Sequence, residues 1–406
     1  MAEFINSTPS SQEPRKRKRK PKKPEKPRPD FPLFPHQNGS WAKKIRGKLH
    51  HFGSWREDPN GEAALTKYLD QKDALHAGRT PRPHAEGLTI RDLVNRFLTS
   101  KRHLLDTHEL APRTFHDYYG VCERVIGVFG LSRLVDDLGP DDFERLRNDL
   151  AKRWGPVRLG NTIQRIRSLF KFGEESGLIA KRVLFGPAFK RPSRKVLRQE
   201  RAKKGKQMFE ADEIRKMLGE AGLQLRAMIL LGINAGLGNS DCGALGIRHL
   251  DLDGGWLDYP RPKTAVDRRA KLWPETVEAI RNVLGKRKNP KDSDNDDLVF
   301  LTKFGAPWTK VRMTEEKDET KIKLFNDDAV SKETKKILLA LDINGRRNFY
   351  CLRHTFETIA GDARDQVAVD HVMGHVRDDM ASVYRERISD DRLVAVADHV
   401  RLWLFA

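Results

Sequence analysis

Cysteine is scarce in this sequence. Cys122, Cys242 and Cys351 are the three cysteines among 406 residues, they are widely separated, and they form no CxxC pair. This usage supports neither a disulfide framework nor a cysteine zinc site. It is typical of a reducing compartment, and we expect a cytoplasmic protein.

Long hydrophobic runs are also missing. The longest apolar stretch, residues 227–237, is interrupted by Asn234 and falls well short of the roughly 20 residues that span a bilayer. The N-terminal residues contain no apolar core of a secretory signal. We therefore expect an intracellular chain with no membrane partner.

The usual nucleotide, protease and esterase motifs fail at residues that their mechanisms require. Gly236 and Gly238 are followed by Asp241 where a dinucleotide loop needs its third glycine, and there is no GxxxxGK phosphate loop. His371 and His375 lack the glutamate of a helical zinc protease, and residues 238–242 lack the second glycine of a nucleophile elbow. We expect no nucleotide cofactor, no metal and no other cofactor.

Positive charge is what the sequence has in excess. There are 77 Lys and Arg against 57 Asp and Glu, a net charge of +20. Residues 1–30 hold ten of these cations and four acids, so about +14 is spread over the rest of the chain. That distribution favours a protein that binds a polyanion over one that is merely basic and soluble.

The length predicts several domains, since 406 residues exceed one ordinary core. Residues 1–30 are rich in Lys, Arg, Pro and Ser, and we expect a disordered basic arm. Residues 31–80 predict a small domain of three short strands, with turns at Asn38-Gly39 and Arg46-Gly47, covered by a helix over 61–75. Its strand region carries the cations Lys43, Lys44, Arg46 and Lys48. They either enter a DNA groove or form a solvated face.

Residues 85–187 predict a domain of four helices. Thr89 is a candidate N-cap for the first helix, and Gly177 ends the fourth. Apolar residues recur at helical spacing, from Ile90 to Leu98, from Phe115 to Phe129, from Phe143 to Leu150 and from Ile163 to Phe170. Arg165, Arg167 and Lys171 on the last helix face either DNA phosphates or solvent.

A basic linker follows at 188–207, where the absence of an apolar period predicts extended chain. The last domain, 208–406, opens with two helices. Residues 256–259 and 269–273 predict a β-hairpin, and helices are expected at 330–341 and over most of the chain from 353 onward. The fold class is therefore multi-domain and mainly α, with small β elements.

One segment of the last domain carries a chemical pattern. Tyr350-Cys351-Leu352-Arg353-His354-Thr355 is followed by Met373-Gly374-His375 and then by Tyr384. This resembles the catalytic region of tyrosine recombinases and phage-type integrases, which runs HxLRH and Thr or Ser, then LGH, then a nucleophilic tyrosine nine residues after that histidine. Residues 234–241 fall where the family has TGLRxSE, and Lys263 falls where its hairpin lysine sits.

The resemblance covers nearly the whole chain beyond the basic arm. It implies a mixed α+β catalytic-type domain at 208–406, a helical core-binding (SAM-like) domain at 85–187 and, more loosely, an arm-type DNA-binding domain at 31–80. It further implies a site-specific recombinase or integrase that cuts and rejoins duplex DNA without a cofactor, through a 3′-phosphotyrosyl intermediate.

The resemblance also assigns roles to the residues of the motif. Tyr384 would attack the phosphodiester, Arg353 would clamp its non-bridging oxygens and His375 would donate a further hydrogen bond. Lys263 would protonate the leaving 5′-oxygen. Tyr350 stands where the family has its first histidine, and it keeps a hydroxyl donor but no titration near neutral pH.

A second position departs from the family pattern. Gly238 occupies the place of the first catalytic arginine, and the neutral amide of Asn239 cannot supply that charge. Loss of one such donor typically costs about 10² to 10³ in rate. Arg248, Arg268 or Arg269 could reach the vacancy. Two functions therefore stay open: an active recombinase, or a recombinase-derived DNA-binding protein, regulatory or architectural, that no longer cleaves.

The C-terminal segment is apolar, with Val400, Leu402, Trp403, Leu404 and Phe405. It docks either on a neighbouring protomer, as in related recombinases, or on its own domain. We expect self-association on DNA and a nucleoid-associated location in the cytoplasm.

Overall fold

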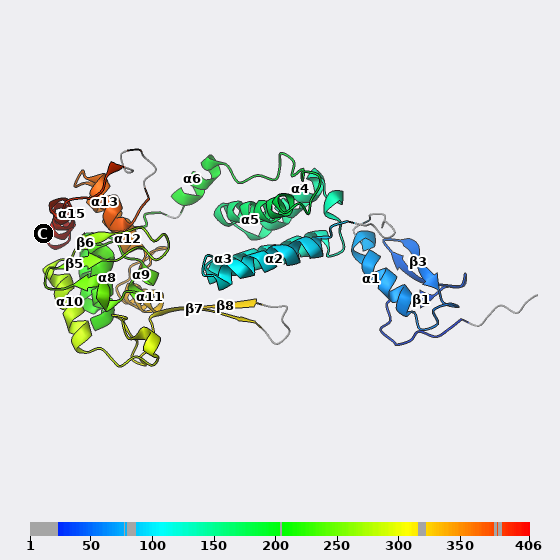
Figure 1. Cartoon of the computed structure of the whole chain (residues 1–406), viewed down its shortest axis with the longest axis horizontal. Coiled ribbons are helices and arrows are strands. Elements are labelled where there is room, and N and C mark those ends of the chain that lie inside the picture. Colours follow the sequence, from blue (N-terminus) through cyan, green and yellow to red (C-terminus); the bar gives the residue numbers. More distant parts are fainter. Residues whose placement is uncertain are drawn as a thin grey trace, which may run out of the picture. The chain divides into compact units, whose positions relative to one another are not determined.

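The computed structural model describes residues 23–76, 78, 87–203, 205–315, 322–376, 380 and 384–406. Most of the basic arm predicted at 1–30 therefore lies outside the described residues. The chain divides into two compact units. One comprises Met1–Ser100, Val121–Arg153 and Thr162–Lys190, and the other comprises Lys101–Gly120, Trp154–Asn161 and Arg191–Ala406. Figure 1 labels most of the elements described below.

The N-terminal part of the described chain folds into a three-stranded antiparallel sheet covered by one helix. Strands β1 (Phe34–Pro35), β2 (Ser40–Ile45) and β3 (Lys48–Ser54) pair in that order, and α1 (Glu62–His76) packs on them. The β2–β3 turn has positive φ at both central residues, Arg46 (50°) and Gly47 (82°), which is the tight turn that a two-residue hairpin requires. Trp41 and Phe52 fill the interior. The predicted sheet and helix are confirmed.

The predicted four helices are present as α2 (Ile90–Asp106), α3 (Pro112–Phe129), α4 (Pro140–Arg153) and α5 (Pro156–Glu175). Thr89 caps α2, since its Oγ1 accepts from the Asp92 amide at 3.2 Å. Phe143 is fully buried and packs edge-on against Phe129 and Phe170. Gly177, with φ of 68°, follows the end of α5.

The basic segment after α5 is not wholly extended, so that expectation was wrong. Residues Arg194–Ala202 form helix α6, capped by Ser193, whose side chain accepts from the Val196 amide. None of its residues is buried, which explains the absence of an apolar period. Helix formation here rests on the cap and on Arg, Lys, Gln, Glu and Leu, which are good helix formers.

The last domain surrounds the buried helix α8 (Leu223–Asn234). The other α-helices that the structure describes over residues 208–406 include α7 (Ala211–Glu220), α9 (Asn239–Gly243), α10 (Pro274–Gly285), α11 (Ala329–Ala340), α12 (Cys351–Gly361), α13 (Gln366–Met373) and α15 (Asp390–Phe405). Strands β4 (Leu250–Asp251), β5 (Trp256–Asp258) and β6 (Arg269–Lys271) form one antiparallel sheet, and β7 (Thr309–Glu315) pairs with β8 (Ile322–Asp328).

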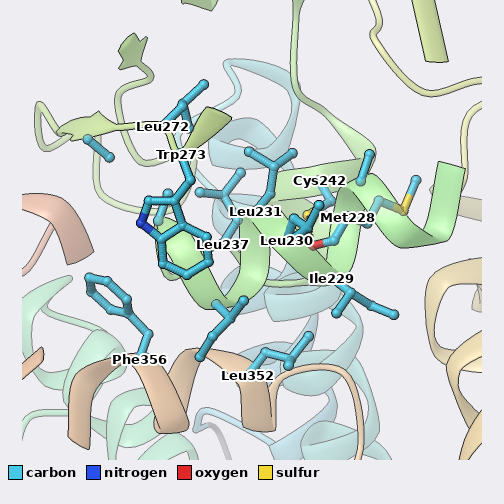
Figure 2. Packing of buried hydrophobic residues seen from close by; sticks show 14 of the residues in the cluster. Met228, Ile229, Leu230, Leu231, Leu237, Cys242, Leu272, Trp273, Leu352 and Phe356 are labelled. Atoms are coloured by element: carbon cyan, nitrogen blue, oxygen red, sulfur yellow. Dashed lines mark hydrogen bonds between the residues drawn. The ribbon is translucent and has the colours of Figure 1, made fainter. Parts of the chain in front are cut away.

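Figure 2 shows the core of this domain. Leu352 and Phe356 point from α12 toward the apolar cluster that contains Leu237 and Trp273. Beside it, the buried Asn234 accepts from the Trp273 amide and the Thr276 hydroxyl, both at 2.9 Å, and donates to the Lys271 carbonyl. A polar side chain is tolerated there because its hydrogen bonds are made.

Helix α15 packs on its own domain. Leu393, Val400 and Leu404 are fully buried, and the Trp273 indole donates to the Ala397 carbonyl at 2.9 Å. Of the two positions expected for the C-terminal segment, the structure shows docking within the same chain.

Helix α10 and the β7–β8 hairpin were not predicted from the sequence. Pro274 at the start of α10 and the buried Thr276, Ala279, Ile280 and Val283 are a helical pattern that could have been recognised. The predicted fold class is confirmed. Within the described part of the chain, no helix is long and apolar enough to cross a membrane.

Candidate active site

Arg353 lies at the centre of the site, buried and held by backbone carbonyls. It is the third residue of α12, and its guanidinium donates to the Gly236 carbonyl at 2.6 Å and to the Met373 carbonyl at 2.7 Å. Burial lowers its pKa, and the nearby Arg261 lowers it further. It remains a cation, because arginine is not deprotonated in proteins. Its orientation is therefore fixed before any ligand arrives.

The loop that supplies one of these carbonyls depends on a glycine. Gly236 has φ of 63°, and a Cβ there would lie 2.5 Å from Met373 Sδ. A side chain would be strained and would collide. Because Gly236 has no side chain, residues 236–238 pack closely enough for the Gly236 carbonyl to reach Arg353.

His375 shares a hydrogen bond with Arg353. Helix α13 ends at Gly374, which has φ of 61°, and His375 Nε2 then lies 3.1 Å from Arg353 Nη2. Since arginine only donates, Nε2 accepts in this arrangement and the ring hydrogen is on Nδ1. Donation from Nε2 to a phosphate would require a hydrogen on Nε2 and would replace this bond from Arg353.

Two carboxylates face the other side of that ring. His375 Nδ1 lies 3.6 Å from Asp370 and 3.8 Å from Glu357, a set whose ligand atoms are close enough to hold a metal ion. The Gln366 amide donates to both carboxylates, at 2.9 and 3.1 Å. This bridge holds the two carboxylates beside Nδ1, at distances longer than a direct hydrogen bond to the ring.

Gly238 and Tyr350, the two departures from the family pattern, lie against each other. A Cβ on Gly238 would stand 3.1 Å from Tyr350 Cδ2. The next residue, Asn239, is turned elsewhere, because its amide donates to Asp328 at 3.2 Å and to Ser331 at 2.8 Å. Asn239 therefore does not replace the missing cation.

Lys263 lies in the connection between β5 and β6. The connection turns on Arg261, whose carbonyl accepts from the amides of Thr264 and Ala265. Arg261 Nη1 donates to the Gly374 carbonyl at 3.3 Å, so the base of the connection lies beside the His375 turn. The Lys263 side chain is exposed, and its assignment as the proton donor stays a prediction.

Tyr384 is 77% exposed. Residues 377–379 and 381–383 around it lie outside the described residues. No hydrogen bond joins Tyr384 to Arg353 or His375, all three of which the structure describes. The structure thus joins Arg353 to His375 by a hydrogen bond and shows none from Tyr384 to either residue.

Sequence reasoning missed four residues around this centre. They are Arg261, Glu357, Gln366 and Asp370. Glu357 is four residues from Arg353 on one helix, so helical spacing could have placed the two on the same face. Gln366 and Asp370 show the same spacing, while Arg261 gave no signal beyond its closeness to Lys263.

The predicted DNA-contacting cations of the N-terminal sheet differ in their surroundings. Lys44 and Lys48 are exposed. Lys43 donates to the Pro32 carbonyl at 3.1 Å and lies 4.9 Å from the Tyr68 ring centre, and Arg46 donates to the His76 carbonyl at 3.3 Å. Lys44 and Lys48 are therefore the cations most open to a phosphate.

The three cations of α5 that were predicted to contact DNA also differ in their surroundings. Arg167 donates to the Phe189 carbonyl at 2.7 Å and covers the Phe185 ring at 4.4 Å, which ties it to packing. Lys171 is exposed and pairs with Glu175 at 3.3 Å. Both line a cleft of about 720 Å³. Arg165 is half-buried, and its role as a phosphate contact stays a prediction.

The chain is similar to proteins of known family and known structure. The model of the phage integrase family matches residues 201–389. A lambda integrase tetramer bound to a Holliday junction is similar with a TM-score of 0.54 and 16% identity, over 89% of this chain and 98% of that one. The Tn1549 transposon integrase in complex with transposon right end DNA has a TM-score of 0.54 and 15% identity, over 78% and 99%.

No curated protein sequence matches the chain. The likeness to the solved structures shows the shared fold, and the family match covers the segment that holds Gly238, Arg353, His375 and Tyr384. Residues 201–389 therefore form a phage integrase family domain with the tyrosine recombinase fold, which confirms the resemblance that the motifs indicate.

Proposed function

We propose that this protein binds duplex DNA and breaks and rejoins its strands through a covalent link to Tyr384. The tyrosine hydroxyl gives up its proton as its oxygen attacks the phosphorus, the bond from phosphorus to the 5′-oxygen breaks and that oxygen gains a proton, and a 3′-phosphotyrosyl link forms. The reaction conserves one phosphodiester-type bond, so rejoining requires neither ATP nor a metal.

The arrangement of Arg353 and His375 carries this proposal. Negative charge gathers on the non-bridging oxygens during attack, and donors fixed in advance lower its energy without reorganisation. The Arg353 guanidinium is fixed by two carbonyls, and His375 lies 3.1 Å from it. A phosphate at this pair would be bound by a cation that needs no rearrangement to receive it.

The exposure of Tyr384 is compatible with this chemistry. A nucleophile that is 77% exposed is free to approach a bound phosphate, and DNA would supply the contacts that bring it to Arg353. Lys263 is similarly exposed on the β5–β6 connection, and it would protonate the leaving 5′-oxygen.

The glycine at position 238 supports a second candidate function. With a glycine in place of the first arginine and Tyr350 packed against it, the site lacks one cation of the family set. A DNA-binding protein that no longer cleaves, and that acts as a regulator or as an architectural protein, would have this feature. The retained Arg353, His375 and Tyr384 favour the active enzyme.

We further propose that the partner is double-stranded DNA, bound by several copies of the chain in the nucleoid of the cytoplasm. The net charge of +20 supports a polyanionic partner. The similar structures named above include a tetramer of lambda integrase on a Holliday junction, which supports self-association on DNA.

Covalent trapping on nicked duplexes tests the function. Cleavage just upstream of a nick releases a short oligonucleotide that diffuses away, so the phosphotyrosyl adduct accumulates. A pool of nicked duplexes of random sequence removes the need to know the target. An adduct with the wild type, and none with Tyr384→Phe of equal DNA affinity, supports the enzyme. DNA binding without any adduct supports the second function.

A further inference from the structure

The site needs a cation where Gly238 has none, and three neighbouring arginines could supply it. Two of them are engaged elsewhere. Arg248 is exposed and pairs with Asp297. Arg269 pairs with Asp258 at 2.5 Å and with Asp390 at 3.0 Å, and it stacks on Trp256 at 4.1 Å. Neither guanidinium is directed to the Arg353 site.

Arg268 is different, because it is buried and fixed. Its side chain is 1% exposed. Nε donates to the Tyr259 carbonyl at 2.7 Å, Nη1 lies 3.3 Å from Asp241 Oδ2, and the guanidinium covers the Tyr259 ring at 4.7 Å. These contacts orient the guanidinium as firmly as the carbonyls orient Arg353.

Asp241 joins Arg268 to the vacant position. The same Oδ2 that Arg268 contacts accepts from the Gly238 amide at 3.0 Å, and it would lie 3.7 Å from a Cβ on Gly238. The Arg268 guanidinium is therefore separated from the start of the missing side chain by a single carboxylate oxygen.

Arg268 also borders the His375 turn. A Cβ on Gly374 would lie 3.6 Å from Arg268 Cδ, and Gly374 directly precedes His375. Arg268 is among the cations whose nearness lowers the pKa of Arg353. Two buried guanidinium groups close together repel each other, and an anion between them relieves that repulsion.

One nitrogen of Arg268 lacks a partner. Nη2 is buried and makes no hydrogen bond with any residue that the structure describes. An unsatisfied buried donor is destabilising, and such a group in a folded protein calls for an explanation. A phosphate oxygen would satisfy it.

We propose that Arg268 binds a non-bridging oxygen of the scissile phosphate and replaces the arginine that Gly238 lacks. The inference rests on the proposed strand cleavage at Tyr384. In that step the new bond joins Tyr384 Oη to phosphorus and the bond to the 5′-oxygen breaks. Arg268 takes no proton and forms no covalent bond; it balances the charge on the oxygen that does not leave.

Cleavage of two matched substrates tests this role. Arg268→Ala is expected to slow adduct formation on a normal phosphodiester about 10²- to 10³-fold with DNA affinity nearly unchanged. On a duplex with a methylphosphonate at the scissile position, one charged oxygen is replaced by a neutral methyl group, so the need for Arg268 falls. On the methylphosphonate duplex, the slowing of adduct formation by Arg268→Ala should be at least tenfold smaller than on the normal phosphodiester. Arg269→Lys, at the neighbouring position, is the control and should cleave both substrates like the wild type.

Arg268→Lys covers the case in which the alanine variant does not fold, since it keeps the charge next to Asp241. A lysine lacks the planar guanidinium fork. Arg268→Lys should therefore slow adduct formation on the normal phosphodiester less than Arg268→Ala does, and the slowing should again be smaller on the methylphosphonate duplex. An equal loss on both substrates, or no loss in a folded variant, would overturn the role of Arg268. If the wild type itself forms no adduct with either substrate, the proposed function fails instead.

Discussion

The ring of Tyr350 fills the space beside Gly238, with Cδ2 3.1 Å from the point where a Cβ on that glycine would stand. The two residues that depart from the family pattern are thus in contact. A larger side chain at 238 would push against the ring, and a smaller ring at 350 would leave a gap. We infer that the two positions are coupled, because each fits the space that the other leaves.

This coupling predicts the outcome of restoring the family residue. Gly238 has φ of −93°, which any residue adopts, so an arginine there meets no backbone strain. It does meet the Tyr350 ring, and we expect Gly238→Arg to lower the free energy of unfolding by about 1–3 kcal/mol, the usual cost of overpacking. Urea denaturation of the purified variant measures it.

The double variant Gly238→Arg with Tyr350→His should regain most of that loss, because the imidazole is smaller. Tyr350→His alone is the matched control. Additive effects of the two substitutions in the double-mutant cycle would argue against contact between them.

Docking of α15 predicts a second stability effect. Leu404 is fully buried, whereas Leu402 on the same helix is 69% exposed. Leu404→Ala should cost about 2–5 kcal/mol, and Leu402→Ala should stay within about 0.5 kcal/mol of the wild type. Denaturation midpoints compare them. The opposite order would indicate that the helix docks elsewhere in solution.

The ion pair between Asp365 and Arg392 at the start of α13 predicts that the stability of the protein depends on pH. The hydrogen bonds from Arg392, at 2.6 Å, hold the pKa of Asp365 below its ordinary value. A carboxyl whose pKa is lower in the folded state stabilises fully above its unfolded pKa of about 3.9, and this stabilisation is lost as the pH falls through the folded value.

Asp365→Asn keeps the helix cap and removes the charge. Its stability deficit should be at most about 1 kcal/mol, as for partly exposed ion pairs. The deficit should be constant from pH 5 to 7 and should shrink below pH 4. Urea midpoints of both proteins across this range measure it, and a deficit that grows with acid would contradict the assignment.

The N-terminal sheet predicts which cations contact DNA. Lys44→Ala and Lys48→Ala should each reduce the slope of log affinity against log salt by about 0.9, the effect of one phosphate contact. Lys43→Ala should affect the slope less, because Lys43 is engaged with Pro32 and Tyr68. Fluorescence anisotropy at several salt concentrations measures all three. A larger slope change for Lys43 than for the other two would reverse this assignment.

Much of the fold could be predicted because local signals agree with the packing. Thr89 caps α2, Arg46 and Gly47 turn the first hairpin, and Gly177 follows the end of α5, as expected from their residue types. Helix α6 was missed because it buries nothing, so propensity and the Ser193 cap alone decide it. The β7–β8 hairpin gave no recognisable alternation, since its exposed residues include Val311 and Phe325.

The site was predictable only in part. The motif spacing located Arg353 and His375, which the structure places 3.1 Å apart. It could not distinguish Arg248, Arg268 and Arg269, since their difference lies in long-range partners such as Asp241, Asp297 and Asp390. Glu357 and Asp370 were likewise missed: helical spacing links Glu357 to Arg353 and Asp370 to Gln366, but their approach to His375 depends on the folded chain.

The central claim is that Tyr384 forms the covalent bond to DNA. Digesting the trapped adduct with a protease and sequencing the DNA-linked peptide by mass spectrometry tests it most directly. The account predicts a nucleotide joined through its 3′-phosphate to the peptide that contains Tyr384, together with a free 5′-hydroxyl on the released strand. A link to another residue, or a 5′-phosphate attachment, would contradict it.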